Sequence, residues 1–175
     1  SVIPKKLQLE LASAQQYRAQ KGSCLFCDML AAEKDFGKRI VFENDSFTIF
    51  LPFFTEYPYG IYLFPKRHFS HITDMTDAER TDFGVALKQI VGMFDTLFDK
   101  EFPYMICMHN APVNSGAVEE DFHFHVEFFP PLRSANQQKF NASSETGAWA
   151  HCNPRCPEET AAELREAYDR YKKSL

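Results

Sequence analysis

Two histidines separated by one residue are the first feature of this sequence that could do chemistry. His123 and His125 lie in the run 122–128, where phenylalanine and valine alternate with polar residues. This period of two predicts a β-strand with two different faces, and it places both histidines and Glu127 on one face. Imidazoles at positions i and i+2 lie roughly 7 Å apart. That spacing suits two ligands of one metal ion, or one ligand beside a catalytic imidazole.

A Cys-x-x-Cys pair, Cys24 and Cys27, offers two thiolates at a spacing that lets both bind one ion. By itself the pair also fits two small buried side chains, and the βαβ context of a redox pair is absent. His68 and His123 would complete a Cys₂His₂ set, which is typical of a closed, structural zinc site. The sequence gaps are too long for a zinc finger, so the fold must assemble this site. We favour it, with zinc as the ion.

A second ligand set competes for His123. His109, His123 and His125 with a carboxylate such as Glu10 would form a harder site, open to zinc or iron. His109 and the His-x-His pair fall on consecutive predicted strands, which makes them plausible neighbours. The residues alone leave both sets open.

Periodicity and turn signals predict the elements that must position these residues. Asn44-Asp45 predicts a hairpin, and Thr76 with Glu79 predicts a capping box at the start of a long helix. We find no repeat or linker, so residues 1–175 are expected to form one α+β domain, an antiparallel sheet with helices packed on one side. The predicted helices are 4–21, 28–34, 76–100 and 161–172, and the predicted strands are 39–43, 46–53, 60–65, 103–109 and 122–129.

Composition narrows the function classes. The 175 residues are 45% hydrophobic and 25% charged, as in ordinary globular proteins. A net charge of −5 argues against binding to nucleic acid, which needs a basic face. No apolar run reaches membrane-spanning length, and the first residues lack the apolar core of a signal peptide. Five cysteines are an odd number, which fits poorly with a secreted protein whose cysteines are all paired in disulfides. We therefore expect a cytoplasmic protein with no nucleic-acid or membrane partner. A small anionic substrate stays open, since a few local cations and backbone amides are enough to bind one.

Several short motifs together carry a resemblance to a known family. They are Phe64-Pro65-Lys66-Arg67-His68, Ile72-Thr73-Asp74-Met75-Thr76, Phe102-Pro103-Tyr104, His109-Asn110-Ala111-Pro112, His123-Phe124-His125, Phe129-Pro130-Pro131-Leu132-Arg133-Ser134 and Lys139-Phe140. In order and spacing they resemble galactose-1-phosphate uridylyltransferase, a family of the histidine-triad superfamily built from two tandem copies of one fold. The resemblance covers nearly the whole chain and is to the second, C-terminal copy. It implies a histidine-triad-like fold.

The resemblance also implies a nucleotidyltransferase of galactose metabolism, which exchanges uridylyl between UDP-glucose and galactose 1-phosphate through a uridylyl-histidine. The family's nucleophile lies in the first copy, in a His-Pro-His-x-Gln motif that this sequence lacks. His125 occupies the nucleophile-like position, but Phe124 and Glu127 depart from the motif. A glutamate beside an incoming phosphate is unfavourable unless it is paired. The resemblance therefore implies a C-terminal domain whose nucleophile lies in an N-terminal half.

Further site residues follow from the resemblance. The family's metal sites match both ligand sets, and the cysteine pair favours the zinc version. Its hexose-phosphate contacts correspond to Lys139, Phe140, Ser144 and Glu145; a lysine can bind a phosphate, and a glutamate can accept from sugar hydroxyls. Ser144 or its neighbour replaces a tyrosine of relatives, so the hexose stays open. The family's active site spans a dimer, so the implied partners are UDP-hexose, hexose 1-phosphate, and a second copy or an N-terminal half.

Two other functions stay open. A stand-alone histidine-triad nucleotide hydrolase or transferase would use His125 as its nucleophile and hold phosphates through Asn110, Asn114 and Ser115. A zinc-stabilised interaction module without catalysis is the third possibility.

Overall fold

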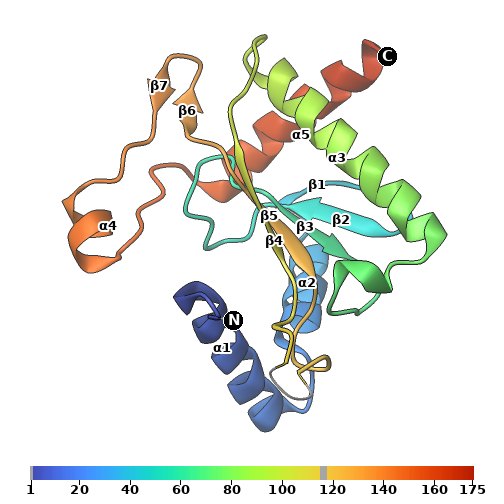
Figure 1. Cartoon of the computed structure of the whole chain (residues 1–175). Helices are drawn as coiled ribbons and strands as arrows, with labels where there is room; N and C mark the ends of the chain where they lie inside the picture. Colours follow the sequence, from blue (N-terminus) through green and yellow to red (C-terminus); the bar gives the residue numbers. More distant parts are fainter. Residues whose placement is uncertain (1, 115–117) are drawn as a thin grey trace.

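A five-stranded antiparallel sheet organises the protein (Figure 1). The computed structural model describes residues 2–114 and 118–175. The strand order is β1-β2-β3-β5-β4, and β6 and β7 form a separate hairpin. The elements are α1 (Lys5–Lys21), α2 (Leu25–Phe36), β1 (Ile40–Glu43), β2 (Phe47–Phe50), β3 (Tyr62–Pro65), the 3-10 helix η1 (Ile72–Asp74), α3 (Asp77–Leu97), β4 (Met105–His109), β5 (His125–Phe129), β6 (Leu132–Ser134), β7 (Gln137–Gln138), α4 (Ser143–Ala148) and α5 (Pro157–Lys173). The predicted α+β class is confirmed.

Local side-chain bonds explain where two of these elements begin. The Asn44 side chain accepts hydrogen bonds from the backbone N–H groups of Ser46 at 3.1 Å and Phe47 at 2.8 Å, which closes the turn between β1 and β2. At the start of α3, the Thr76 hydroxyl accepts from the Glu79 N–H, and the Glu79 carboxylate accepts from the Thr76 N–H. The predicted hairpin and the predicted capping box are both confirmed.

The strand that carries the two histidines is shorter than predicted. The sequence predicted a strand from residue 122, whereas β5 begins at His125. Before it, the Phe122 N–H donates to the Val118 carbonyl, and the Phe124 N–H donates to the Phe69 carbonyl at 2.7 Å. These bonds hold residues 122–124 outside the sheet ladder, so strand alternation does not govern the direction of the His123 side chain.

One face of the sheet packs against α3 and α5. Ile49, Leu63 and Val126 are fully buried there, together with Ile90 of α3 and Leu164 of α5. Figure 1 shows these two helices crossing each other, and they pack against one another. This larger core supplies most of the apolar burial but carries none of the predicted metal ligands.

The opposite face packs against α1 and α2. Phe50 and Phe64 are fully buried there, against Phe26 of α2 and Ala14 of α1. The expectation that helices pack on one side is therefore wrong. The physical reason is that β2 and β3 carry large apolar side chains on both faces, and each face must be covered to remove them from water. Among the described residues, no helix combines the length and apolar character needed to cross a membrane.

Candidate metal centres

Four side chains from three separate segments meet beside the start of α2. Cys24 is the N-cap residue of this helix and Cys27 lies in its first turn. His68 follows β3, and His123 precedes β5. The four ligand atoms all lie within 4.8 Å of one another. The structure thus brings together the Cys₂His₂ set that the sequence favoured.

The distances within this thiol cluster suit a small tetrahedral ion. The Cys27 Sγ lies 3.3 Å from the His68 Nδ1 and 3.4 Å from the His123 Nδ1. In a tetrahedral zinc site, bonds of about 2.3 Å to sulfur and 2.0 Å to nitrogen place these atoms roughly 3.5 Å apart. The cluster therefore needs little rearrangement to surround one ion.

The electrostatics of the thiol cluster also favour a cation. A hydrogen bond from the Cys27 thiol lowers the pKa of Cys24, and the same contact raises the pKa of Cys27. The Cys24 thiolate in turn raises the pKa of His68, whereas burial lowers the pKa of His123. A neutral His123 and an ionised thiol are the protonation states in which these groups bind metal.

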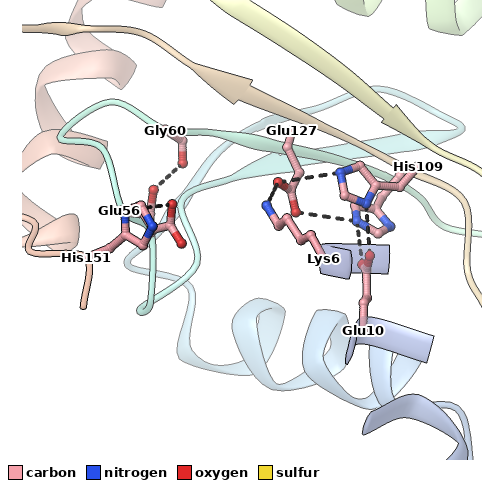
Figure 2. Close-up of polar contacts among 9 residues, drawn as sticks. Lys6, Glu10, Glu56, Gly60, His109, Glu127 and His151 are labelled. Carbon is pink, nitrogen blue, oxygen red and sulfur yellow. Dashed lines mark hydrogen bonds and ion pairs between the residues drawn. The ribbon is translucent and has the colours of Figure 1, made fainter. Parts of the chain in front are cut away.

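A second cluster lies where α1 crosses the ends of β4 and β5. It contains Glu10 of α1, His109 at the end of β4, and His125 and Glu127 of β5, and their ligand atoms also lie within 4.8 Å of one another. His109 and His125 are register partners across the two strands, and their ring centroids are 4.5 Å apart. Figure 2 shows Glu10 reaching up from α1 and Glu127 lying between His109 and Lys6. We call this group the carboxylate cluster.

Each carboxylate of this cluster contacts both histidines. The Glu10 oxygens lie 2.9 Å from the His109 Nδ1 and 3.0 Å from the His125 Nε2. The Glu127 oxygens lie 3.6 Å from the Nε2 atoms of both rings, and one of them binds the Lys6 Nζ at 2.6 Å. The carboxylates therefore hold the two imidazoles from two sides.

Burial and charge act against each other in the carboxylate cluster. Burial raises the pKa of Glu10, but its contacts with His109 and His125 outweigh this and lower it to about 2. Burial also raises the pKa of Glu127, and His125 leads the opposing contacts that lower it to about 2. Burial lowers the pKa of His125, but Glu10 and then Glu127 raise it to about 9. The cluster thus concentrates negative charge that a protonated imidazole or a metal ion can balance.

The two histidines of the His-x-His pair belong to different clusters. The sequence analysis offered His123 to both ligand sets. In the structure its Nδ1 faces Cys27, and Glu127 is the fourth residue of the group formed by Glu10, His109 and His125. The sequence did hold a signal for Glu127, since alternation placed it on the same strand face as His125. Lys6 carried no such signal, because only the fold brings α1 beside β5.

Both clusters fit a metal ion, on different observations. In the thiol cluster, the spacing of the sulfur and nitrogen atoms suits one ion. In the carboxylate cluster, the buried Nε2 atom of His109 has no hydrogen-bond partner among the described residues. A buried imidazole nitrogen without a partner is unfavourable unless a ligand or ion satisfies it. The two donor sets differ: sulfur and nitrogen suit zinc, whereas oxygen and nitrogen suit zinc or iron.

The residues expected to contact a hexose phosphate lie elsewhere. Lys139 and Glu145 are buried and form an ion pair, and the Lys139 Nζ also lies 5.4 Å from the centre of the Tyr57 ring. The pairing leads the causes that lower the pKa of Glu145 to about 2. Phe140 is 72% exposed, and Ser144 lies one residue before Glu145 on α4. The structure thus brings Lys139 and Glu145 together and leaves the Phe140 ring in solvent.

The proposed phosphate-binding asparagines lie at the other end of β5. Asn110 follows His109, which pairs with the first residue of β5. Lys139 follows the last residue of β5 in the chain. The Asn110 side chain accepts a hydrogen bond from the Ile72 N–H at 2.9 Å, which gives it a structural partner. Asn114 is exposed, with φ at 60°. Ser115 lies outside the described residues.

Comparison with known proteins identifies the family. The family model described as "Galactose-1-phosphate uridyl transferase, C-terminal domain" matches residues 10–173. The galactose-1-phosphate uridylyltransferase of Thermotoga maritima is 39% identical over 164 residues, which cover 94% of this chain and 51% of that protein. The counterpart from Neurospora crassa is 35% identical and is covered over 45% of its length. The chain thus spans about half the length of these curated relatives.

Solved structures agree with the sequence relatives. A uridylyltransferase structure is similar with a TM-score of 0.89 at 31% identity, over 97% of this chain and 53% of that one. A zinc-bound histidine triad family protein from Mycobacterium smegmatis shares the fold, with a TM-score of 0.57 at 18% identity, over 87% of this chain and 98% of that one. The chain belongs to the galactose-1-phosphate uridylyltransferase family and corresponds to its C-terminal domain.

Proposed function

We propose that this domain serves a hexose-1-phosphate uridylyltransferase by binding metal and the hexose phosphate, while the nucleophilic histidine comes from an N-terminal half. One observation carries the proposal. His125, in the nucleophile-like position, is 1% exposed, and its Nε2 faces the carboxylates of Glu10 and Glu127. A nucleophile needs an open path to the phosphorus, so this ring is better suited to bind metal or to support its neighbours.

The hexose-phosphate contacts are proposed at Lys139, Phe140, Ser144 and Glu145. Lys139 is a buried cation, and a small shift of its ammonium away from Glu145 would allow it to bind a phosphate oxygen. Glu145 would then accept from sugar hydroxyls. The exposed Phe140 ring offers an apolar surface to a sugar face or to a partner chain. The substrates that follow are a UDP-hexose and a hexose 1-phosphate.

Zinc is proposed at the thiol cluster. Cys24, Cys27, His68 and His123 would hold it, and the ion would link α2 to the segments that flank β3 and β5. A closed site of four protein ligands supplies stability rather than chemistry. The carboxylate cluster is the alternative site, for zinc or iron, with Glu127 in the place that the sequence analysis gave to His123.

Residues 1–175 are proposed to act as one domain of a cytoplasmic dimer. Within the described ranges 2–114 and 118–175, the strand β4 pairs with β5 alone and leaves Met105, Ile106 and Met108 between 42% and 54% exposed, as an open edge of the sheet. An apolar edge strand is a surface that proteins normally cover. A second copy or an N-terminal half would do so.

A transfer assay tests the proposal. The domain is incubated with UDP-glucose labelled in its uridylyl phosphate, with and without galactose 1-phosphate. We expect no acid-labile label on the domain and no UDP-galactose, whereas the full-length Thermotoga maritima relative serves as positive control. Label that the wild-type domain acquires and a His125→Asn variant does not would instead establish the stand-alone nucleotidyltransferase.

Binding to galactose 1-phosphate tests the other half of the proposal. We expect the wild-type domain to bind galactose 1-phosphate in isothermal titration calorimetry. Lys139→Gln should bind at least about tenfold more weakly, and Lys139→Arg, which keeps the charge, should lose less affinity. Lys172→Gln, at a half-exposed lysine of α5, is the control for loss of one positive charge. If neither sugar phosphate nor UDP-glucose binds, the zinc-stabilised module without catalysis is the better description.

A further inference from the structure

A small cavity on the α3–α5 side of the sheet carries charge that the proposed function does not use. Its volume is about 300 Å³, and it lies where the C-terminal end of α3, the middle of α5 and strand β6 meet. The buried Tyr59 forms part of its wall and belongs to the larger core, whereas both candidate metal clusters lie with α1 and α2 on the other face. The cavity is therefore separate from the metal centres.

Three arginines and two glutamates line this cavity. Glu163 is fully engaged: one oxygen accepts from Arg155 and the other from the Tyr59 hydroxyl, both at 2.6 Å. Arg170 donates to the Thr96 carbonyl at 2.8 Å and so neutralises the carbonyl end of α3. These contacts account for two of the three guanidinium groups and one of the two carboxylates.

The third guanidinium, that of Arg133, is left without a partner. It forms no hydrogen bond or ion pair within the described part of the chain, and its Nε is buried without a partner. Glu166, the remaining carboxylate, is exposed on α5 and does not pair with it. Three positive and two negative groups leave the cavity with a net positive charge, and Arg133 is the one guanidinium among them that has no partner in the described part of the chain.

We propose that this cavity binds a small oxyanion, of the size of inorganic phosphate or a compact phosphate monoester. A guanidinium is a rigid fork of donors that matches two oxygens of such an anion, and a buried donor without a partner, such as the Arg133 Nε, is energetically unfavourable. The Arg133 fork provides the primary contact, and the Ser134 hydroxyl at the cavity wall is a second donor. The cavity is at the lower end of the range for ligand sites, which excludes a nucleotide sugar.

The site has a consequence for the hairpin that carries it. Arg133 lies on β6, and the Lys139 N–H donates to the Pro131 carbonyl across the same hairpin. An anion held between β6 and α5 would therefore fix the position of the segment from which Lys139 extends. The oxyanion site does not depend on the proposed function, because its ligands differ from those of the hexose-phosphate site.

Nuclear magnetic resonance with inorganic phosphate as the probe tests the proposal. The ¹⁵N-labelled chain is titrated with phosphate at constant ionic strength. We expect saturable shifts of the amides of Leu97, Phe98, Arg133 and Ser134. Shifts confined to the surroundings of Lys139 would locate phosphate only at the hexose-phosphate site and would overturn the proposal, as would the absence of any saturable shift.

Matched variants complete the test. We expect Arg133→Gln to raise the dissociation constant for phosphate at least about tenfold, and Arg133→Lys, which keeps the charge but loses the fork, to raise it less. Arg80→Gln removes the same charge from an exposed arginine and should bind phosphate as the wild type does. The spectrum without phosphate shows whether each variant is folded. If Arg133→Gln does not fold, Arg133→Lys still tests the guanidinium fork. A folded Arg133 variant that binds phosphate with unchanged affinity refutes the site.

Discussion

The ring of Phe64 lies beneath both candidate metal clusters, and replacing it tests whether they depend on the aromatic core. Phe64 is fully buried on β3, and its ring centroid lies 4.7 Å from that of His125 and 5.6 Å from that of His123. It also contacts the rings of Phe26 and Phe50. A Phe64→Leu substitution keeps the site apolar but removes the ring on which the His125 imidazole stacks and which the His123 imidazole meets edge to face.

The expected cost follows from these contacts. An aromatic pair contributes about 0.5–1.5 kcal/mol beyond burial, and a reduced core side chain leaves a void, so we expect the free energy of unfolding to fall by about 1–3 kcal/mol. For a chain of this size each kcal/mol lowers the melting temperature by about 2–4 °C. We also expect the metal content after dialysis, measured by inductively coupled plasma mass spectrometry, to fall below that of the wild type.

A matched substitution in the other core separates these two effects. Phe94 of α3 is equally buried, and its ring lies 4.9 Å from that of Phe102, on the face without metal ligands. Phe94→Leu should lower the melting temperature by a similar amount and leave the metal content unchanged. The reasoning fails if the two variants retain equal amounts of metal, because the Phe64 ring would then act through general stability alone.

Three further predictions concern charge and metal. A chelator should lower the melting temperature of the domain, and added zinc should restore it; a melting temperature that does not respond to chelation contradicts a structural ion. In a denaturant melt, Glu33→Gln should lower the free energy of unfolding by about 3–5 kcal/mol, because Glu33 is 2% exposed and binds Arg39 at 2.8 Å. Glu43→Gln, which removes the charge of a half-exposed ion pair, should lower it by about 0–1 kcal/mol. Equal losses would show that burial does not cause the difference. Arg67 leads the contacts that lower the pKa of Glu79 to about 2, so the stability that ionised Glu79 contributes is complete above the ordinary pKa of 4.5 and is lost as the pH falls towards 2. In denaturant melts from pH 5 to pH 2, the free energy of unfolding should therefore decline less steeply for Glu79→Gln than for the wild type. Parallel curves for the two proteins would refute this.

The sequence was most informative where the chemistry is local. The Asn44 turn, the capping box at Thr76 and the alternation of β5 depend on neighbours within a few residues, so each could be predicted without the fold. The Cys-x-x-Cys pair could be predicted to share an ion for the same reason. Its histidine partners could only be proposed, since 41 residues separate Cys27 from His68 and 96 separate it from His123.

What could not be predicted depends on contacts across the sheet. The direction of the His123 ring follows from the Phe124 N–H bond to the Phe69 carbonyl, because β5 begins only one residue after Phe124. The contact of Lys6 with Glu127 follows from the path of α1, a helix with a weak apolar stripe. Helices on both faces follow from the total apolar surface of the sheet rather than from any one segment. These are properties of the packed chain, and no short pattern encodes them.

Because His123 and His125 belong to different clusters, both clusters could hold a metal ion at the same time without strong repulsion between the two ions. Two divalent ions on residues so close in the chain would repel each other strongly if their ligands were neutral. Here each cluster offers two groups that can carry negative charge, Cys24 and Cys27 in one and Glu10 and Glu127 in the other. A divalent ion in the thiol cluster would therefore form an electroneutral unit with its own ligands, and one in the carboxylate cluster would be neutralised by Glu10 and Glu127 and leave only the single charge of Lys6. The strand β5 can thus border two loaded centres without the charge of one expelling the ion from the other.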